Sequence, residues 1–492
     1  MTLLWAVALL TYRLAVCIYR IWLHPLAKVP GPPLLAASYL PYLWHDSIRG
    51  KWNPRIAKLH AQYGPIVRIG PNHLAIEPSL AWTYVFANRP GKPEYPKHAA
   101  FYGPEGRYSL IGAPTTQAHR SLRKLLARGF NDAAIMSQES VIANQVDLLM
   151  ARLSEHASRS QPVNMVEWFR FTTFDITGAL TFGYSFGCLE SQKYHPLAEV
   201  AFEAIRQNSW RRVLTAYTTF DIPDWLMSNL PIFSHFRSVF NGAKLRAKER
   251  ISLGEFGRYG RPDFFTHLLQ EPQPGDPPIT EKQLYSNSFL LVMAGSDTTA
   301  TTLSGLIFHI SQNPETYKLL RDEIESEFAA ESDVTFRRCA SLNFLNACIW
   351  ETLRLYPPVP DIPPRVSPGD VIDGYPIPEG TSISVYLFPP FRNSSNFVDA
   401  DMFCPQRWLP SHHALYDSRF SKDNLSLVKP FSHGPRDCLG QNLAFNEVRL
   451  VISRMFLRFY FEALPGQQGW LENQRMFIVF EKSPLYIRLR QR

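Results

Sequence analysis

The chain has 492 residues, of which 45% are hydrophobic and 19% charged. This balance excludes a disordered or fibrous protein, and the length is enough to bury a large core together with a cofactor. The formal net charge of +8 is modest for the length and does not point to nucleic acid. Six cysteines lie far apart without a C-x-x-C pair, which argues against a disulfide scaffold or a zinc finger.

The first 23 residues predict a retained membrane anchor. Thr2–Leu23 reaches the roughly 20 residues of a crossing helix if Arg13 is included, whose charged end can reach the headgroup layer. Basic residues follow the apolar run and no acidic residue precedes Asp46, so the body is expected in the cytosol. The alternatives are a helix that lies in the membrane surface, a removed signal peptide, for which no cleavage site is visible, and a buried N-terminal helix.

Residues 24–33 predict a proline-rich hinge, because Val29-Pro-Gly-Pro-Pro33 cannot continue a helix. Helical patterns dominate from about 116 to 330, and strand-like pieces occur before and after them, at 66–69, 73–76 and 382–387. We therefore expect residues 34–492 to form one large domain that is mainly α with small β-sheets (α+β). The aromatic-rich span 206–240, which includes Phe220 and Trp225, indicates core, or alternatively a lid over a substrate entrance.

Cys438 lies in a glycine-flanked loop, Phe431-Ser-His-Gly434-Pro-Arg436-Asp-Cys438-Leu-Gly440, which enters a helical pattern at Asn442–Phe461. The amides and dipole of a helix N-terminus favour a thiolate. The glycines permit tight turns and close approach of a flat partner. A thiolate in such a place suits an axial ligand to haem iron. For a lone cysteine the simpler interpretation is an inert buried thiol, but here the whole ten-residue pattern matches.

This segment resembles the F-x-x-G-x-R-x-C-x-G haem-ligand signature of the cytochrome P450 family. Three further segments resemble motifs of that family in the same order along the chain: Ala294-Gly-Ser-Asp-Thr-Thr299, Glu351-Thr-Leu-Arg354 and Phe403-Cys-Pro-Gln-Arg-Trp408. The similarity covers essentially the whole chain and is strongest to fungal microsomal members of the isotrichodermin hydroxylase type. It implies a cytochrome P450 fold, with a single haem domain behind the anchor and haem b held by the Cys438 thiolate.

The resemblance also implies roles for residues of the other motifs. Ala294 and Gly295 are small enough for a helix to pass close to the iron, and Asp297 and Thr298 are expected to relay protons during oxygen scission. A hydroxyl that binds the carbonyl one turn back could open a groove for water on this helix. A polar stripe on a buried helix is the alternative interpretation of these side chains.

Glu351 and Arg354 lie on one helical face, and the resemblance implies that they join Arg407 in a buried, structural ion network. Haem carries two carboxylates that need cationic partners. The residues expected to reach them are His119, Arg123, Arg365 and Arg436, of which His119 departs from the Trp of many relatives. Phe431, Gly434 and Gly440 are expected to shape the haem-binding loop around the cysteine.

The leading hypothesis is a haem-thiolate monooxygenase that inserts one oxygen atom of O2 into an apolar small molecule, such as a polyketide, terpenoid or alkaloid of fungal secondary metabolism. The alternatives are a haem-thiolate isomerase, dehydratase or nitric oxide reductase, and a haem-binding sensor without turnover. The resemblance implies electrons from NADPH through cytochrome P450 reductase, with cytochrome b5 as a further partner, and location in the endoplasmic reticulum membrane. Basic residues next to the expected haem site, Arg120, Lys124 and Arg128, predict a docking patch for an acidic donor or anionic lipid.

Overall fold

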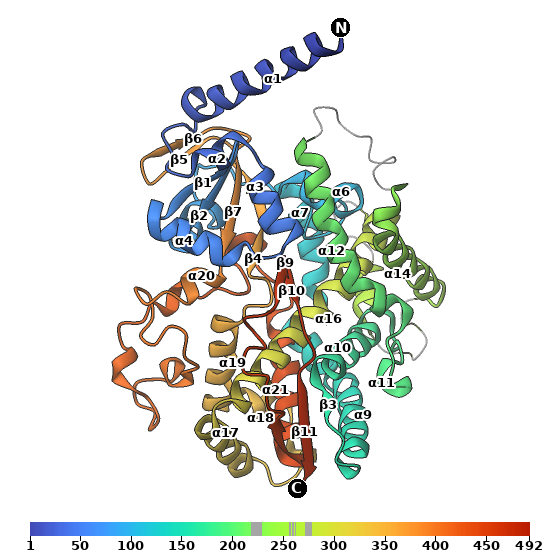
Figure 1. Ribbon diagram of the computed structural model, residues 1–492. Helices are drawn as coiled ribbons and strands as arrows, with labels where there is room; N and C mark the ends of the chain where they lie inside the picture. The colour runs from blue at the N-terminus through green and yellow to red at the C-terminus, as the bar shows by residue number, and fades with distance from the viewer. Residues whose placement is uncertain (218–228, 255–256, 258–259, 261, 271–277) are drawn as a thin grey trace.

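The computed structural model describes residues 1–217, 229–254, 257, 260, 262–270 and 278–492. One apolar helix stands apart at the N-terminal end, a small sheet lies beneath it, and a larger helical body follows (Figure 1). The mainly helical α+β architecture predicted from the sequence is confirmed. Of the aromatic-rich span, Phe220 and Trp225 lie outside the described residues, whereas Phe233 is buried and Phe236 packs its ring on Phe289.

The main sheet joins segments that are about 300 residues apart in the sequence. Its strand order is β1 (Ile66–Gly70), β2 (His73–Ile76), β7 (Ser382–Tyr386) and β4 (Asp361–Val366). β2 and β7 are parallel, and the outer pairs are antiparallel. β1, β2 and β7 are buried along their whole length, as the apolar strand-like pieces predicted.

The helical body is built around α16 (Glu281–Ser311), a helix of 31 residues that runs through the centre of the molecule (Figure 1). Thr280 and Gln283 form a capping box that fixes its start. Most of its C-terminal half is buried against its neighbours, so this helix is a core element and not a surface helix. The other principal helices are α7 (Thr116–Leu126), α9 (Glu139–Ser158), α10 (Met165–Phe182), α12 (Pro196–Tyr217), α14 (Ser234–Ser252), α17 (Pro314–Glu327), α18 (Phe336–Ala340), α19 (Asn343–Leu355) and α21 (Gln441–Arg458).

Three smaller sheets lie in the part of the chain that the structure describes. β3 (Val163–Asn164), β11 (Tyr486–Gln491) and β8 (Phe459–Ala463) form an antiparallel sheet in the order β3-β11-β8. β5 (Asp370–Ile372) pairs with β6 (Tyr375–Ile377). β9 (Arg475–Phe477) pairs with β10 (Val479–Glu481), and Ile478 between them has a φ of 72°, a backbone conformation that β-branched residues rarely adopt. The long irregular segment from 392 to 440 lies between β7 and α21.

The N-terminal segment is a continuous helix, α1 (Thr2–Ile18) followed by the π-helical turn η1 (Tyr19–Leu23). It is long and apolar enough to cross a membrane, and none of it is buried against the body. The proline-rich segment that follows is packed on the body of the protein. Leu26 and Val29 are buried, and the Pro30 carbonyl accepts a hydrogen bond from Arg68 N at 2.8 Å. The expected hinge is therefore packed on the edge of the main sheet.

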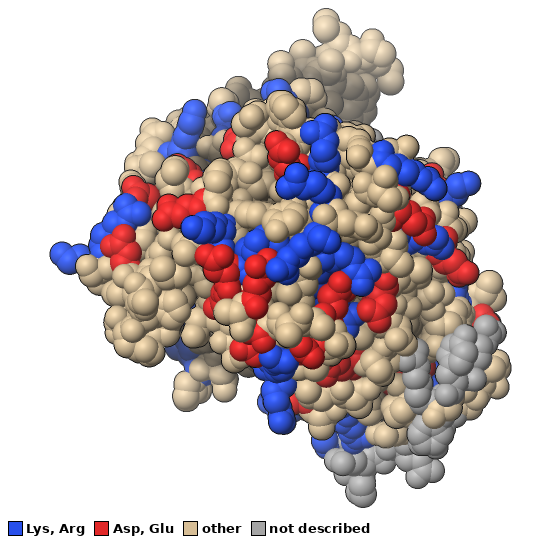
Figure 2. All heavy atoms as spheres, turned by 90° about the horizontal axis from the view of Figure 1, so that it is seen from below, with Lys and Arg blue, Asp and Glu red and all other residues tan. Residues whose placement is uncertain are grey.

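The end of the molecule farthest from α1 carries both signs of charge. Figure 2 views this end and shows basic and acidic side chains interspersed. α17 and β11 contribute to it (Figure 1), and the ion pairs Arg492–Glu325, Arg458–Glu331 and Arg338–Glu327 form in this region. Mixed, paired surface charge of this kind is typical of a face in water.

Candidate active site

The loop before α21 presents Cys438 in a defined backbone conformation. Gly434 has a φ of +80°, and a Cβ there would lie 2.0 Å from the carbonyl oxygen of Phe86, so only glycine fits this close approach. The amide of Cys438 donates to the carbonyl oxygen of Phe431 at 2.8 Å, which closes the loop. Gly440 is the N-cap of α21, so the cysteine lies two residues before a helix N-terminus, as predicted.

The Cys438 side chain has accessible surface although it lies in a densely packed part of the protein, and burial is the main reason that its thiol pKa is raised. The Gly440 amide and Arg123 act in the opposite direction, but desolvation outweighs them. A coordinated metal ion would deprotonate the thiol outright.

One side of α16 carries solvent-accessible residues. Ala294 is exposed and Thr298 half-buried although the helix runs through the core. The Thr298 hydroxyl donates to the carbonyl oxygen of Ala294, one turn back, at 2.7 Å, as the composition of this helix predicted. Gly295 does not lie on that side, because a Cβ there would point at the Thr177 side chain of α10, 3.0 Å from its Oγ1. Its small size serves helix packing.

Asp297 points away from that open side and is 2% exposed. Its Oδ1 accepts a hydrogen bond from Lys482 Nζ at 2.7 Å, and Arg170 Nε of α10 lies 3.4 Å from the same oxygen. Burial would raise the pKa of this carboxyl, but Lys482 and Arg170 together lower it below the ordinary value. Asp297 and Thr298 are adjacent in sequence but bonded to different partners. Lys482 and Arg170 were not predicted, because no motif contains them.

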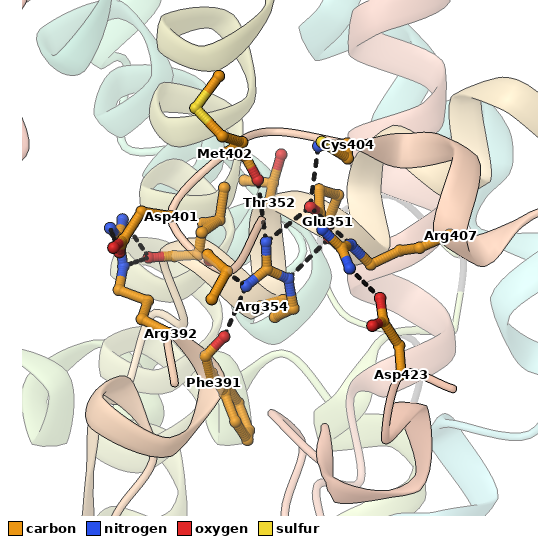
Figure 3. Close-up of polar contacts among 12 residues, drawn as sticks. Glu351, Thr352, Arg354, Phe391, Arg392, Asp401, Met402, Cys404, Arg407 and Asp423 are labelled. Atoms are coloured by element: carbon orange, nitrogen blue, oxygen red, sulfur yellow. Dashed lines mark hydrogen bonds and ion pairs between the residues drawn. The ribbon is translucent and has the colours of Figure 1, made fainter. Parts of the chain in front are cut away.

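The ion network predicted around Glu351 is fully buried (Figure 3). The Glu351 carboxylate accepts hydrogen bonds from Arg354 at 2.7 and 2.9 Å and from Arg407 Nε at 3.0 Å. The Cys404 amide and the Trp408 indole also donate to it, at 2.9 and 2.8 Å. Burial would raise the pKa of Glu351, but Arg354 and Arg407 lower it below the ordinary value, so the group is a carboxylate.

The arginines of the network also hold the irregular segment before the cysteine loop. Arg354 donates to the carbonyl oxygens of Phe391 and Ala400, each at 2.6 Å, and Arg407 to that of Val398 at 2.9 Å. Arg407 is further paired with Asp423 (Figure 3). Asp423 was not predicted, because no motif contains it and it is 16 residues from its partner.

Of the residues expected to bind the haem carboxylates, two lie on α7. His119 is buried, and burial with the nearby charge of Arg436 lowers its pKa to about 4, so the ring is neutral. Arg123 donates to the carbonyl oxygen of Asp437 at 2.8 Å and to its carboxylate at 2.5 Å. In this arrangement Arg123 holds the residue just before Cys438, and its contact with haem stays a prediction.

The other two, Arg365 and Arg436, lie together with Lys97. The segment that carries Lys97 is bridged to Arg365, both arginines pair with the carboxylate of Glu94, and the charge of Glu94 also acts on Lys97. Arg436 also donates to the Ala113 carbonyl at 2.8 Å and Arg365 to that of Tyr95 at 3.1 Å. Burial, Arg365 and Arg436 lower the pKa of Lys97 well below its ordinary value. The cluster therefore holds more positive charge than its own carboxylate balances.

Two buried donors of this cluster have no acceptor. The Tyr102 hydroxyl and Arg365 Nε are buried without a hydrogen-bond partner, and Lys97 Nζ lies 5.5 Å from the centre of the Tyr102 ring. Burial raises the pKa of Tyr102, so its hydroxyl stays a donor. Unsatisfied buried donors beside excess positive charge fit the two carboxylates of haem. Lys97 and Tyr102 were missed because no motif contains them.

Comparisons with known proteins agree with this arrangement. The sequence model of the family described as "Cytochrome P450" matches residues 30–489. The chain is 35% identical to cytochrome P450 monooxygenase cpaH of Aspergillus oryzae, with 97% of this chain and 91% of that protein covered. It is equally identical to cytochrome P450 monooxygenase tpeC of Talaromyces stipitatus, over 96% and 91% of the two chains, and to lcsI of Purpureocillium lilacinum, over 98% and 92%.

Replacing Glu351 with Gln should destabilise the protein strongly, because it leaves the buried Arg354 guanidinium without a carboxylate and removes one of the two carboxylates that Arg407 pairs with. We expect a loss of about 3–5 kcal/mol in the free energy of unfolding, measured by urea denaturation. Glu155→Gln is the matched control, because Glu155 pairs with Arg152 at the surface, and it should cost less than about 1 kcal/mol. Equal losses in the two variants would contradict the network's structural role.

Proposed function

The chain belongs to the cytochrome P450 family, and on that premise we propose that Cys438 is the residue that ligates the haem iron. The chain is a haem-thiolate monooxygenase. The observation that carries the assignment of Cys438 is its position, exposed on a loop two residues before the N-cap of α21, a helix that packs on α16. Bound haem supplies dioxygen activation at the iron, and the chain supplies the ligand, the carboxylate partners and the protons.

We propose that Thr298 is the residue of α16 that donates protons to the reacting oxygen. Its hydroxyl lies on the open side of the helix with Ala294, and it already donates to the Ala294 carbonyl. A water held beside that carbonyl would complete a path for protons, because the hydroxyl both donates and accepts. Asp297, the preceding residue of the helix, would supply protons to Thr298. Its carboxylate does not lie on the open side of the helix and is bonded to Lys482.

The substrate is proposed to be an apolar secondary metabolite, such as a polyketide, terpenoid or alkaloid. Support comes from the aromatic side chains of Phe236, Phe240 and Phe289, which pack together where α14 meets α16. An isomerase, dehydratase or nitric oxide reductase is less well supported, because the relatives reported above are named monooxygenases.

NADPH–cytochrome P450 reductase, and cytochrome b5 as a second donor, are the proposed electron donors. Arg120 and Lys124 are exposed on α7, the helix that also places Arg123 on the cysteine loop. A basic surface next to the haem ligand would attract an acidic donor protein. This supports docking of the donor on the cysteine side of the haem.

The N-terminal helix is proposed to anchor the protein in the endoplasmic reticulum membrane, with residues 34–492 as the catalytic domain on the cytosolic side. Figure 1 shows α2 (Pro33–Ala37) and α3 (Leu40–Leu43) just beneath α1. Leu34 and Leu40 there are 75% and 63% exposed, and Trp44 is 53% exposed. Arg20 joins the two parts by donating to the Ala37 carbonyl at 2.9 Å. Exposed apolar side chains beside a candidate span fit a surface that enters the lipid interface.

The function is tested by supplying the purified protein with reductase, NADPH, isotope-labelled dioxygen and an extract of apolar metabolites. We expect one labelled oxygen atom in a product, detected by mass spectrometry. Product formation without label from dioxygen would contradict a monooxygenase.

Thr298→Val should lower product per NADPH about tenfold or more and release hydrogen peroxide instead, because proton delivery fails.

Arg120→Glu with Lys124→Glu should slow reduction of the protein by the reductase but not by dithionite.

Replacing Lys97 with Met should weaken haem binding. A buried charged hydrogen bond is worth about 1.5–3 kcal/mol, so haem transfer to apomyoglobin should be roughly 10–100-fold faster. The haem-free protein should not lose stability, because one of its crowded cations has been removed. Lys92→Met is the control, since its ammonium is exposed and pairs with Asp370. Haem release at the wild-type rate from Lys97→Met would refute a carboxylate contact.

Deleting residues 2–23 should weaken membrane association without abolishing it. In flotation with phospholipid vesicles we expect the deleted protein to stay partly bound through Leu34, Leu40 and Trp44. Their replacement by Ser in the deleted protein should release it, at about 1.5–3 kcal/mol for each apolar side chain withdrawn from lipid. Met402→Ser is the control, because Met402 is 59% exposed elsewhere. Full release by the deletion alone would show that α2 and α3 do not enter the interface.

A further inference from the structure

The C-terminal segment contacts α16 through a buried lysine. Lys482 directly follows β10, and its side chain is fully buried. Its Nζ donates to Asp297 Oδ1 at 2.7 Å and to Thr301 Oγ1 at 2.6 Å, so it contacts two successive turns of α16. α10, α16 and the β9–β10 hairpin meet at the middle of the molecule (Figure 1). A lysine whose charge is buried needs a specific partner, and that partner is the carboxylate of the proposed proton relay.

The same carboxylate is held from a second side by α10. Arg170 Nε lies 3.4 Å from Asp297 Oδ1, and the Arg170 side chain is 15% exposed. The other oxygen, Oδ2, is buried without a hydrogen-bond partner. An ionised oxygen without a donor in a buried place is costly, so the carboxylate is not optimised for stability alone. Oδ2 is therefore the oxygen at which a further donor, such as a water molecule, would satisfy the carboxylate.

Other titratable groups also face this site. Tyr356 of α19 and Tyr194 before α12 both have a raised pKa, mainly through burial, and the Asp297 charge adds to it. Glu167 of α10 lies near Tyr194. Lys482 has its pKa lowered to about 8, by burial first and by Arg170, while Asp297 opposes the shift. With both phenols protonated, Lys482 and Arg170 are the cations that set the charge state of Asp297.

We propose that Lys482 is a positioning residue that keeps the Asp297 carboxylate ionised and turned to the α10 side of α16, so that the C-terminal segment controls when Asp297 passes protons to Thr298. The proposal rests on the proposed monooxygenase function. Transfer through Asp297 then requires its carboxylate to take up a proton from water at the free Oδ2 and to give it on. While the bond to Lys482 is intact, that protonation is disfavoured.

The proton affinity of Asp297 tests the proposal directly. In the haem-loaded protein, the infrared band of the protonated Asp297 carboxyl is identified by its loss in Asp297→Asn and followed against pH. The folded pKa of Asp297 is below the ordinary value, so the wild-type band should appear only at low pH. Lys482→Met should move its midpoint upward by about 1–3 pH units, whereas Lys482→Arg should leave it near the wild-type midpoint. Arg170→Gln should cause a smaller upward shift, because its guanidinium is farther away.

A midpoint that is the same in Lys482→Met and in wild type would overturn the proposal. If Lys482→Met does not load haem, adding Asp297→Asn should restore loading, because no carboxylate is then stranded; failure of the double variant would also refute the pairing. The pH dependence of product per NADPH should shift in the same direction as the infrared midpoint. Loss of the thiolate-haem spectrum in all variants, wild type included, would instead count against the proposed function, so the two failures are distinguishable.

Discussion

The pairing of the Glu351 carboxylate with Arg354 and Arg407 is the interaction on which the site depends. It ties α19, a core helix, to the long irregular segment that leads to Cys438. That segment is not paired in a β-sheet. Arg354 and Arg407 donate hydrogen bonds to its backbone carbonyl oxygens, and Glu351 in turn accepts hydrogen bonds from both arginines. A cysteine ligand on a loop needs such support, because a site is only as rigid as the contacts that hold its backbone.

The requirement that buried charge be balanced distinguishes three parts of the interior. Around Glu351 the chain supplies both signs, with Asp423 as the second carboxylate. Around Lys97 the chain supplies cations in excess and has buried donors without acceptors. The two carboxylates of haem would balance this charge and accept these hydrogen bonds. Around Asp297 the cations again exceed the carboxylates, but there one oxygen lacks a donor, as a group that moves protons requires. The first part is scaffold, and the other two are proposed to be functional.

The sequence predicted those parts of the site that are local in the chain. The ten-residue cysteine motif, the Glu351–Arg354 pair on one helical face and the Thr298 hydroxyl bond to the turn before it all follow from short spacings. Asp423, Lys97 and Lys482 could not be predicted, because each meets its partner only after segments distant in sequence have packed together. Gly295 shows the limit of motif arguments, since its small size serves the contact with Thr177 of α10. Burial raises the pKa of the Cys438 thiol, and the hydrogen bond from the Gly440 amide lowers it by less.

The central claim, that Cys438 is the thiolate ligand of haem iron, is tested most directly by the carbon monoxide difference spectrum of the reduced, haem-loaded protein. The account predicts a Soret band shifted far to the red, because a thiolate donates electron density to the iron, and its loss in Cys438→Ala with the fold retained. Absence of that band from well-folded, haem-loaded wild-type protein, or its persistence in Cys438→Ala, would contradict the claim.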